Sequence, residues 1–306
     1  MFPTTAADRR WDLARLGAVA AVVGSIVSLC VGTSLAKSLF ATVGAQGVTA
    51  MRITIAAILL CAVWRPWRGR WTAAELRAVA LFGVILGSMN LMFYMALRTV
   101  PLGVTVAIEF SGPLAVALAS SRRFVDLVWI ALAVIGLGLL LPLGHAAVAL
   151  DPAGVCFALG AGFCWALYIV LGSRLGHMHG GRAIALSMLF AALVALPFGV
   201  MEAGWKLVDP TLLGFGVVVA ILSSAIPYSL EIYALPRIPR QSFGVLLSLE
   251  PAVGSLAALA ILDERLSLVE WAAIGAIVTA SVGAALGAAR VGDAKAAAPA
   301  PGVPPA

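Results

Sequence analysis

Charged residues are scarce in this sequence, and their scarcity excludes most soluble proteins. Of the 306 residues, 11% are Asp, Glu, Lys or Arg, whereas 62% are hydrophobic and the mean hydropathy is +1.06. A soluble protein of this size would carry about 25% charged residues. Too little polar surface is available to cover a globule in water, so the composition predicts an integral membrane protein that faces the lipid bilayer.

Residues suited to catalysis, metal binding or ATP use are equally sparse. His177 and His179 stand in a polar break without a third ligand nearby, and no GxxxxGK[ST] phosphate-binding loop occurs. The cysteines lie inside apolar runs without metal or redox spacing, which favours small buried hydrophobic groups: Cys30, Cys61, Cys156 and Cys164. We expect no metal, no cofactor, no ATP-driven step and no nucleic-acid partner. An intramembrane enzyme remains the least favoured alternative, because no histidine falls within an apolar run.

Long apolar runs, separated by short charged or Pro/Gly breaks, make up most of the chain. A helix needs about 20 apolar residues to cross the hydrocarbon, and the absence of period-2 alternation favours helices over barrel strands. The sequence therefore predicts an all-α integral membrane protein. The ten expected spans are 13–35, 48–64, 77–97, 101–120, 125–143, 152–172, 183–201, 211–234, 241–262 and 268–289.

Lys and Arg residues gather in alternate connections, which predicts the orientation in the membrane. If the N-terminus is cytoplasmic, 15 of the 20 basic residues fall in cytoplasmic segments. The remaining five are Lys37, Arg52, Arg98, Lys206 and Arg265. We expect both termini in the cytoplasm, with a short N-terminal segment (1–12), an uncleaved first span and a disordered Ala/Pro-rich tail (290–306).

The two halves of the chain show a weak internal repeat. A shift of 138 residues aligns Ala96, Leu97, Pro101 and Pro113 with Ala234, Leu235, Pro239 and Pro251, and it brings Asp126 onto Glu264. The repeats would comprise residues 13–143 and 152–289, five spans each. Because five is odd, the second half would enter the membrane from the opposite side, an arrangement typical of secondary transporters.

Several segments resemble bacterial threonine/homoserine exporters of the EamA type, in the drug/metabolite transporter (DMT) superfamily. They are SLAKSLF (34–40), GVTAMR (47–52), VPLGVTVAIEFSGPLAVALASSRR (100–123), LGAGFCWALYIV (159–170), ILSSAIPYSLEIYAL (221–235) and LSLEP followed by LDERLS, which ends at Ser267. The resemblance implies ten helices in two EamA repeats, a bacterial inner-membrane location and proton-coupled efflux of small amino acids. An EamA carrier of another metabolite or a drug is the alternative.

Charged side chains inside the expected spans are the candidate transport residues, because an ionisable group at the bilayer centre is costly. They are Lys37, Arg52, Glu109, Glu231 and Glu250, and their near-balance of charge predicts pairing in a shared interior. An amino acid needs an anion for its ammonium group, for which Glu109 or Glu250 are suited. It needs a cation for its carboxylate, which Lys37 or Arg52 could supply. Structural ion pairs, snorkelling or interfacial anchoring are the alternative roles.

Polar and aromatic residues of the third, sixth and eighth expected spans are weaker candidates for a cavity wall: Asn90, Tyr94, Trp165, Tyr168 and Tyr228. They suit helix packing equally well. Gly83 and Gly87 are expected to allow close approach of helices.

Overall fold

The computed structural model describes residues 6–119, 124–140, 150–175, 181–234 and 246–297, and within these ranges all its regular elements are helices, without a strand. The first half contains α1 (Ala6–Ser38), α2 (Phe40–Trp64), α3 (Ala73–Ala96), α4 (Leu102–Glu109), α5 (Ser111–Ala119) and α6 (Phe124–Leu140). The second half contains α7 (Pro152–Leu175), α8 (Gly181–Ala203), α9 (Pro210–Ala220), α10 (Ile226–Ala234), α12 (Glu250–Leu262) and α13 (Leu268–Ala297). Single turns η1 (Pro66–Arg68), η2 (Gly204–Val208) and the π-helical η3 (Ile221–Ala225) connect or interrupt them.

Six helical segments among the described residues are long and apolar enough to cross a membrane. They are Leu16–Ser38, Phe40–Trp64, Ala73–Ala96, Pro152–Gly172, Gly181–Val208 and Pro210–Glu231. Shorter apolar helices cover Leu102–Val116, Glu250–Leu262 and Leu268–Ala280. The all-α membrane architecture is thereby confirmed, whereas the count of ten spans stays a prediction.

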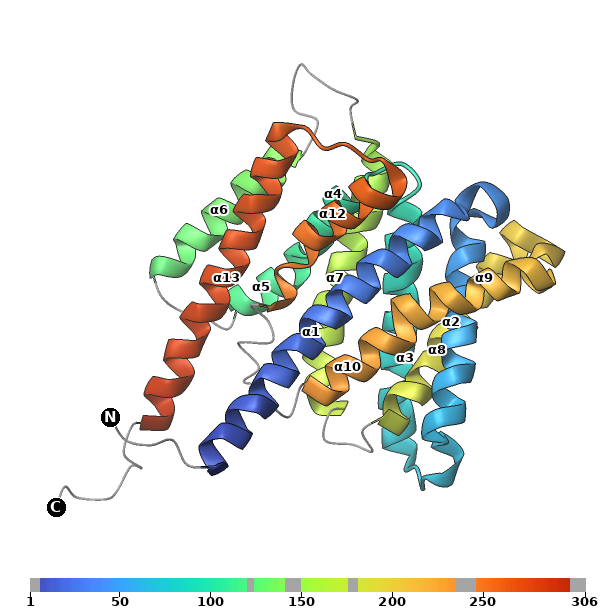
Figure 1. Cartoon of the computed structure of the whole chain (residues 1–306), viewed down its shortest axis with the longest axis horizontal. Helices are drawn as coiled ribbons and strands as arrows, with labels where there is room; N and C mark the ends of the chain where they lie inside the picture. Colours follow the sequence, from blue (N-terminus) through green and yellow to red (C-terminus); the bar gives the residue numbers. More distant parts are fainter. Residues whose placement is uncertain (1–5, 120–123, 141–149, 176–180, 235–245, 298–306) are drawn as a thin grey trace.

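The helices pack as one bundle in which elements from both halves of the sequence alternate (Figure 1). Helix α2 lies along α8, and α3 packs against both α7 and α8. On the other side, α1 packs against α10 and α12, α12 crosses α4, and α13 lies along α6. Segments far apart in the sequence therefore enclose a common interior.

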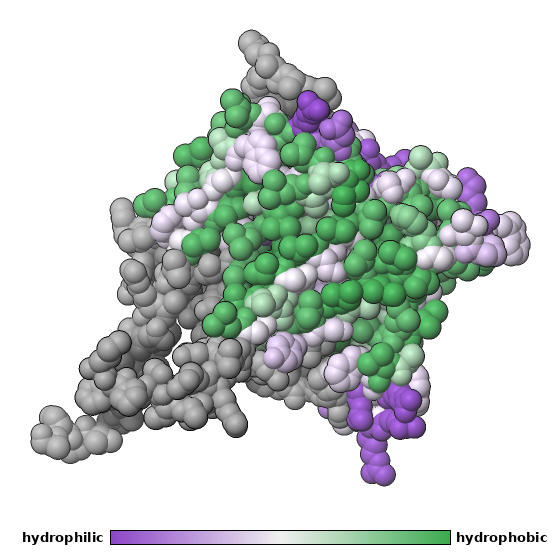
Figure 2. All heavy atoms as spheres, in the orientation of Figure 1, coloured by the Kyte–Doolittle hydropathy of each residue, from purple (hydrophilic) through white to green (hydrophobic). Residues whose placement is uncertain are grey.

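The outside of the bundle is apolar between two polar ends. On the face shown in Figure 2, hydrophobic residues form a broad green area, and purple gathers near the α2–α3 connection and, at the opposite end, near the α12–α13 connection. Large apolar side chains stand exposed on the helices, among them Leu16, Ile58, Phe163, Leu193 and Met201. A continuous apolar surface of this kind is suited to contact with lipid.

Proline breaks one expected span into two helices. Within the span predicted at 101–120, α4 ends at Glu109 and α5 begins at Ser111. Pro113 has no N–H to donate to the carbonyl of Glu109 four residues earlier, which weakens the helix at this point.

Helix ends also differ from the expected spans. Helix α2 begins at Phe40 and contains a kink at Gly44, whose φ of 73° favours glycine. The tail expected to be disordered from residue 290 is helical as far as Ala297, and residues 298–306 lie outside the described part. Alanine, the strongest helix former, extends α13 beyond its apolar segment.

Small residues allow α3 and α8 to approach closely. A Cβ atom added to Gly83 would lie 2.4 Å from the carbonyl oxygen of Ser187, and one on Gly87 would lie 2.8 Å from that of Ala191. The packing role expected for both glycines is confirmed.

Candidate functional site

Arg52 of α2 is a positive charge buried among neutral polar groups, with 3% of the residue exposed. Its Nη1 atom donates hydrogen bonds to the carbonyl and hydroxyl oxygens of Ser223, at 3.2 and 3.4 Å, and to the Ser224 hydroxyl at 3.0 Å. Nη2 donates to Oδ1 of Asn90, and the guanidinium carbon lies 4.8 Å from the centre of the Tyr94 ring. Dipoles and an aromatic face therefore stabilise this charge in the interior.

Within the described part of the chain, no carboxylate lies at ion-pair distance from Arg52. Among the same residues, the buried Nε atom of Arg52 and the buried hydroxyl of Tyr94 have no hydrogen-bond partner. Buried polar groups of native proteins are nearly always satisfied. A buried cation with a free donor is therefore suited to receive an anionic ligand.

The π-helical turn η3 supplies two partners of Arg52 because the helix is widened there. Pro227 has no N–H to donate to the Ser223 carbonyl four residues earlier, so this oxygen is available to the guanidinium group. The turn is also packed tightly, since a Cβ on Gly32 of α1 would lie 2.6 Å from the backbone nitrogen of Ser223. Such π turns often occur at functional sites.

Three carboxylates share this interior. Glu109 ends α4 and Glu250 begins α12, with 6% and 7% of the residue exposed. The two interact electrostatically, and Glu109 also interacts with Arg52. Glu231 of α10 interacts with Glu250 and accepts a hydrogen bond of 2.9 Å from the Ser25 hydroxyl of α1. The structure thus brings four of the five candidate charges together.

The aromatic candidates occupy different parts of the same region. Tyr228 interacts electrostatically with Arg52 and with all three acids. Tyr168 interacts with Tyr228 and stacks on Phe82 at 4.6 Å. Trp165 meets Phe110, the residue after Glu109, edge to face at 5.4 Å. These contacts suit both a cavity wall and helix packing.

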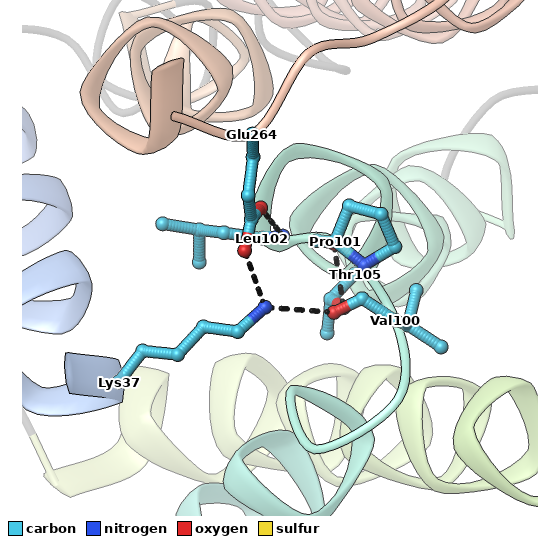
Figure 3. Close-up of polar contacts among 6 residues, drawn as sticks. All are labelled: Lys37, Val100, Pro101, Leu102, Thr105 and Glu264. Atoms are coloured by element: carbon cyan, nitrogen blue, oxygen red, sulfur yellow. Dashed lines mark hydrogen bonds and ion pairs between the residues drawn. The ribbon is translucent and has the colours of Figure 1, made fainter. Parts of the chain in front are cut away.

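Lys37 lies apart from this group, near the end of α1. Its Nζ atom forms an ion pair of 2.6 Å with Glu264, in the α12–α13 connection, and donates to the carbonyl of Val100 at 3.2 Å (Figure 3). The expected pairing among the five candidate charges is therefore wrong: Lys37 pairs outside the set, and no carboxylate of the described residues lies at ion-pair distance from Arg52. A one-dimensional pattern does not show that the α12–α13 connection folds over the end of α1.

Other acids at the same end of the bundle cap helices. Asp151 precedes α7 and accepts hydrogen bonds from the Thr99 hydroxyl at 2.9 Å and from the backbone nitrogens of Ala153 and Gly154. The hydrogen bond from Thr99, assisted by these backbone groups, lowers the pKa of Asp151. A charged Asp151 at neutral pH is favoured next to the positive end of the α7 dipole.

A separate groove of about 580 Å³ is lined mainly by apolar residues. It is bounded by α2, α8, η2 and α9, with Met51, Ile55 and Val200 in its lining, and none of its lining residues is ionisable. We therefore place the candidate site at the buried charges and not in this groove.

Sequence reasoning missed Ser223, Ser224, Ser25 and Glu264. The sequence carries one signal for the two adjacent serines and one for Glu264. The pair of serines stands just before Pro227, where a helix has a free carbonyl, and the 138-residue shift aligns Glu264 with Asp126. Neither signal identified the partner.

A helical bundle with an apolar exterior and buried charges in its interior defines an integral membrane protein of the kind that handles polar solutes. The profile of the EamA-like transporter family matches residues 152–286. The chain is 48% identical over 262 residues to the threonine/homoserine exporter RhtA of Escherichia coli K12, covering 86% of this chain and 89% of that protein. The RhtA of Salmonella typhimurium SL1344 is 48% identical over 255 residues, covering 83% and 86%.

A more distant relative and a solved structure are also similar to the chain. The inner membrane transporter YedA of Escherichia coli K12, itself uncharacterised, is 31% identical over 62% of this chain and 64% of its own. One crystal structure superposes with a TM-score of 0.62 at 21% identity, over 89% of this chain and 98% of that one, which shows a shared fold. The chain belongs to the EamA-like transporter family, within the drug/metabolite transporter superfamily, and is a multi-pass membrane transporter rather than an enzyme.

Proposed function

We propose that the protein exports threonine, homoserine or a closely related small amino acid across the bacterial inner membrane. Fold alone does not define a substrate. The proposal is supported by the relatives named as threonine/homoserine exporters, which are 48% identical over most of both chains. The inner-membrane location is supported by the name of the more distant relative.

The observation that carries the substrate class is the buried, unneutralised Arg52. A substrate carboxylate would supply the negative counter-charge that is missing next to Arg52. It would also accept a hydrogen bond from the Nε atom, which has no partner. The ammonium group of the same molecule would then bind Glu109 or Glu250, since Glu109 interacts with both Arg52 and Glu250. Of the two cations first considered for the carboxylate, Lys37 is already paired with Glu264, so Arg52 is preferred.

The transport cycle would be proton-coupled alternating access. The chain would cross the membrane ten times, in repeats of residues 13–143 and 152–289 with opposite orientation and with both termini in the cytoplasm. Buried carboxyl groups such as Glu109, Glu231 and Glu250 can carry a proton as well as bind an ammonium group. The interaction of Glu109 with Arg52 would couple the proton to substrate binding.

The test is efflux of labelled threonine and homoserine from preloaded cells that produce the wild type, Arg52→Gln, Arg52→Lys or Arg265→Gln at equal membrane abundance. Charged hydrogen bonds are worth about 1.5–3 kcal/mol, so Arg52→Gln should slow export about tenfold to a hundredfold. Arg52→Lys keeps the charge without the planar fork and should lie in between. Arg265, which is 82% exposed in its side chain, provides the matched control.

Unchanged export by Arg52→Gln would make Arg52 a structural residue. A wild type that exports neither amino acid would contradict the substrate. A panel of toxic amino acid analogues and unrelated drugs, scored by growth protection, would then identify the class that the transporter carries.

A further inference from the structure

One polar cluster joins the two halves of the chain at a single end of the bundle. The carboxylate of Glu264 accepts from Nζ of Lys37 at 2.6 Å and from the backbone nitrogen of Leu102 at 2.9 Å, while Nζ also donates to the carbonyl of Val100 (Figure 3). We call these four residues the clasp. Glu264 belongs to the second half, and the other three belong to the first.

The clasp combines favourable charge contacts with partial exposure to solvent. Lys37 lies in the last turn of α1 and the Glu264 carboxylate lies at the first residue of α4, so each charge faces a helix end of opposite polarity. Their side chains are 18% and 20% exposed. Water can therefore replace these contacts without leaving a buried, unpaired charge.

An apolar layer lies directly below the clasp and also combines both halves. Leu97, Leu102 and Val106 pack there against Ala258 of α12. Gly103 contacts the same helix so closely that a Cβ on it would lie 1.9 Å from the Ser255 hydroxyl oxygen. On α4 this layer lies between the clasp at Leu102 and the buried Glu109, so clasp and apolar layer together separate this end of the bundle from that carboxyl group.

The clasp lies at the end of the bundle opposite the arginine-rich α2–α3 connection (Figures 1 and 2). In the proposed topology this is the periplasmic end, where an exporter must release its substrate. A contact between halves at this end must break each time the site opens outward.

We propose that the clasp is the periplasmic gate of the transporter, in which Glu264 holds the second half against Lys37 and Leu102 of the first half. Pairing of Lys37 with Glu264 holds the outer end closed, and its rupture opens the path from Arg52 to the periplasm. This inference rests on the proposed transport function, because it presupposes that the site opens alternately to the two sides.

Accessibility of a buried reporter tests the gate directly. Ser34 is fully buried one turn before Lys37 on α1, so Ser34→Cys, with the four native cysteines replaced by alanine, reports opening at this end. A membrane-impermeant thiol reagent is added outside intact cells, and the labelling rate is measured. Loss of this partly exposed ion pair in Glu264→Gln should raise that rate about twofold to fivefold.

The neighbouring acid supplies the matched control. Asp263 is exposed and pairs with Arg265 in the same connection, and among the described residues it forms no ion pair with the first half. Asparagine tolerates its φ of 52°, so Asp263→Asn should label at the unmodified rate. Equal labelling of the Glu264→Gln and Asp263→Asn proteins would overturn the gate.

A locked clasp provides a second test. In the double variant Lys37→Cys/Glu264→Cys, a short cross-linker that a reductant cleaves would join the two cysteines. The cross-linked protein should not export, and reduction should restore export. Export that continues at the uncross-linked rate would contradict the proposal. Because labelling of Ser34→Cys does not depend on the substrate, faster labelling without threonine export would sink the proposed substrate and support the gate.

Discussion

At the scale of the residue, the described part of the protein keeps a guanidinium charge in an apolar bundle without a carboxylate at ion-pair distance. Arg52 is balanced by dipoles of Ser223, Ser224 and Asn90 and by the Tyr94 ring. Had an internal carboxylate neutralised it, a substrate carboxylate would have to displace that partner. Neutral partners hold the group in place and leave its charge available.

Glu109 should carry the coupling proton. Glutamine has the shape of the protonated acid and cannot ionise, so Glu109→Gln should lose export driven by a pH gradient in liposomes. Exchange of internal for external labelled threonine should persist, because it needs no net proton movement. Asp263→Asn, which removes an exposed acid, is the control. A Gln variant that responds to the pH gradient like the wild type would exclude Glu109 as the coupling group.

At the scale of the element, prolines position the polar groups. Pro113 breaks the helix next to Glu109, Pro227 follows the π turn that contacts Arg52, and Pro251 stands beside Glu250 at the start of α12. Pro113 and Pro227 each remove one backbone N–H from a helix, and the freed carbonyl must find another partner. Pro251 lies in the first turn of α12, where the backbone N–H has no acceptor within the helix. Helix breaks and functional charges therefore coincide.

Close helix crossing should make Gly83 intolerant of a side chain. In Gly83→Ala the new Cβ would lie 2.4 Å from the Ser187 carbonyl oxygen, and overpacking of this kind costs about 1–3 kcal/mol. We expect a lower melting temperature of the detergent-solubilised protein.

Gly214 of α9 is the matched control, because a Cβ there meets nothing within 4 Å. Gly214→Ala should leave stability unchanged or raise it by up to about 1 kcal/mol through better helix propensity. Equal melting temperatures for the two alanine variants would show that the α3–α8 contact relaxes without cost.

At the scale of the whole molecule, the connections are expected to alternate between the two sides of the membrane. Trp205 in η2 is 90% exposed and Trp67 in η1 is 67% exposed, and they lie in connections predicted on opposite sides. In a protein without its native cysteines, Trp205→Cys should react with an impermeant thiol reagent added outside cells. Trp67→Cys should react after the membrane is permeabilised. The reverse pattern would invert the topology.

Much of the helical framework could be predicted from the sequence, and less of the site. The expected span at 152–172 agrees with α7, because hydrophobic length and charged ends are local properties. Four of the five candidate charges do meet, and the cost of a charge in lipid explains why they turn inward. The partner of Lys37 was not predicted, because Glu264 lies in a polar connection that hydropathy alone assigns to the surface.

The sequence by itself determined that this is a helical membrane protein, and it predicted the orientation of that protein. In lipid, each backbone must satisfy its own hydrogen bonds, so apolar length alone specifies helices. Only the tertiary structure decided which polar groups meet. Arg52 and Ser223 are 171 residues apart, and Lys37 and Glu264 are 227 apart. Helical periodicity defines the faces of a helix, but the packing of one helix against another decides what each face contacts.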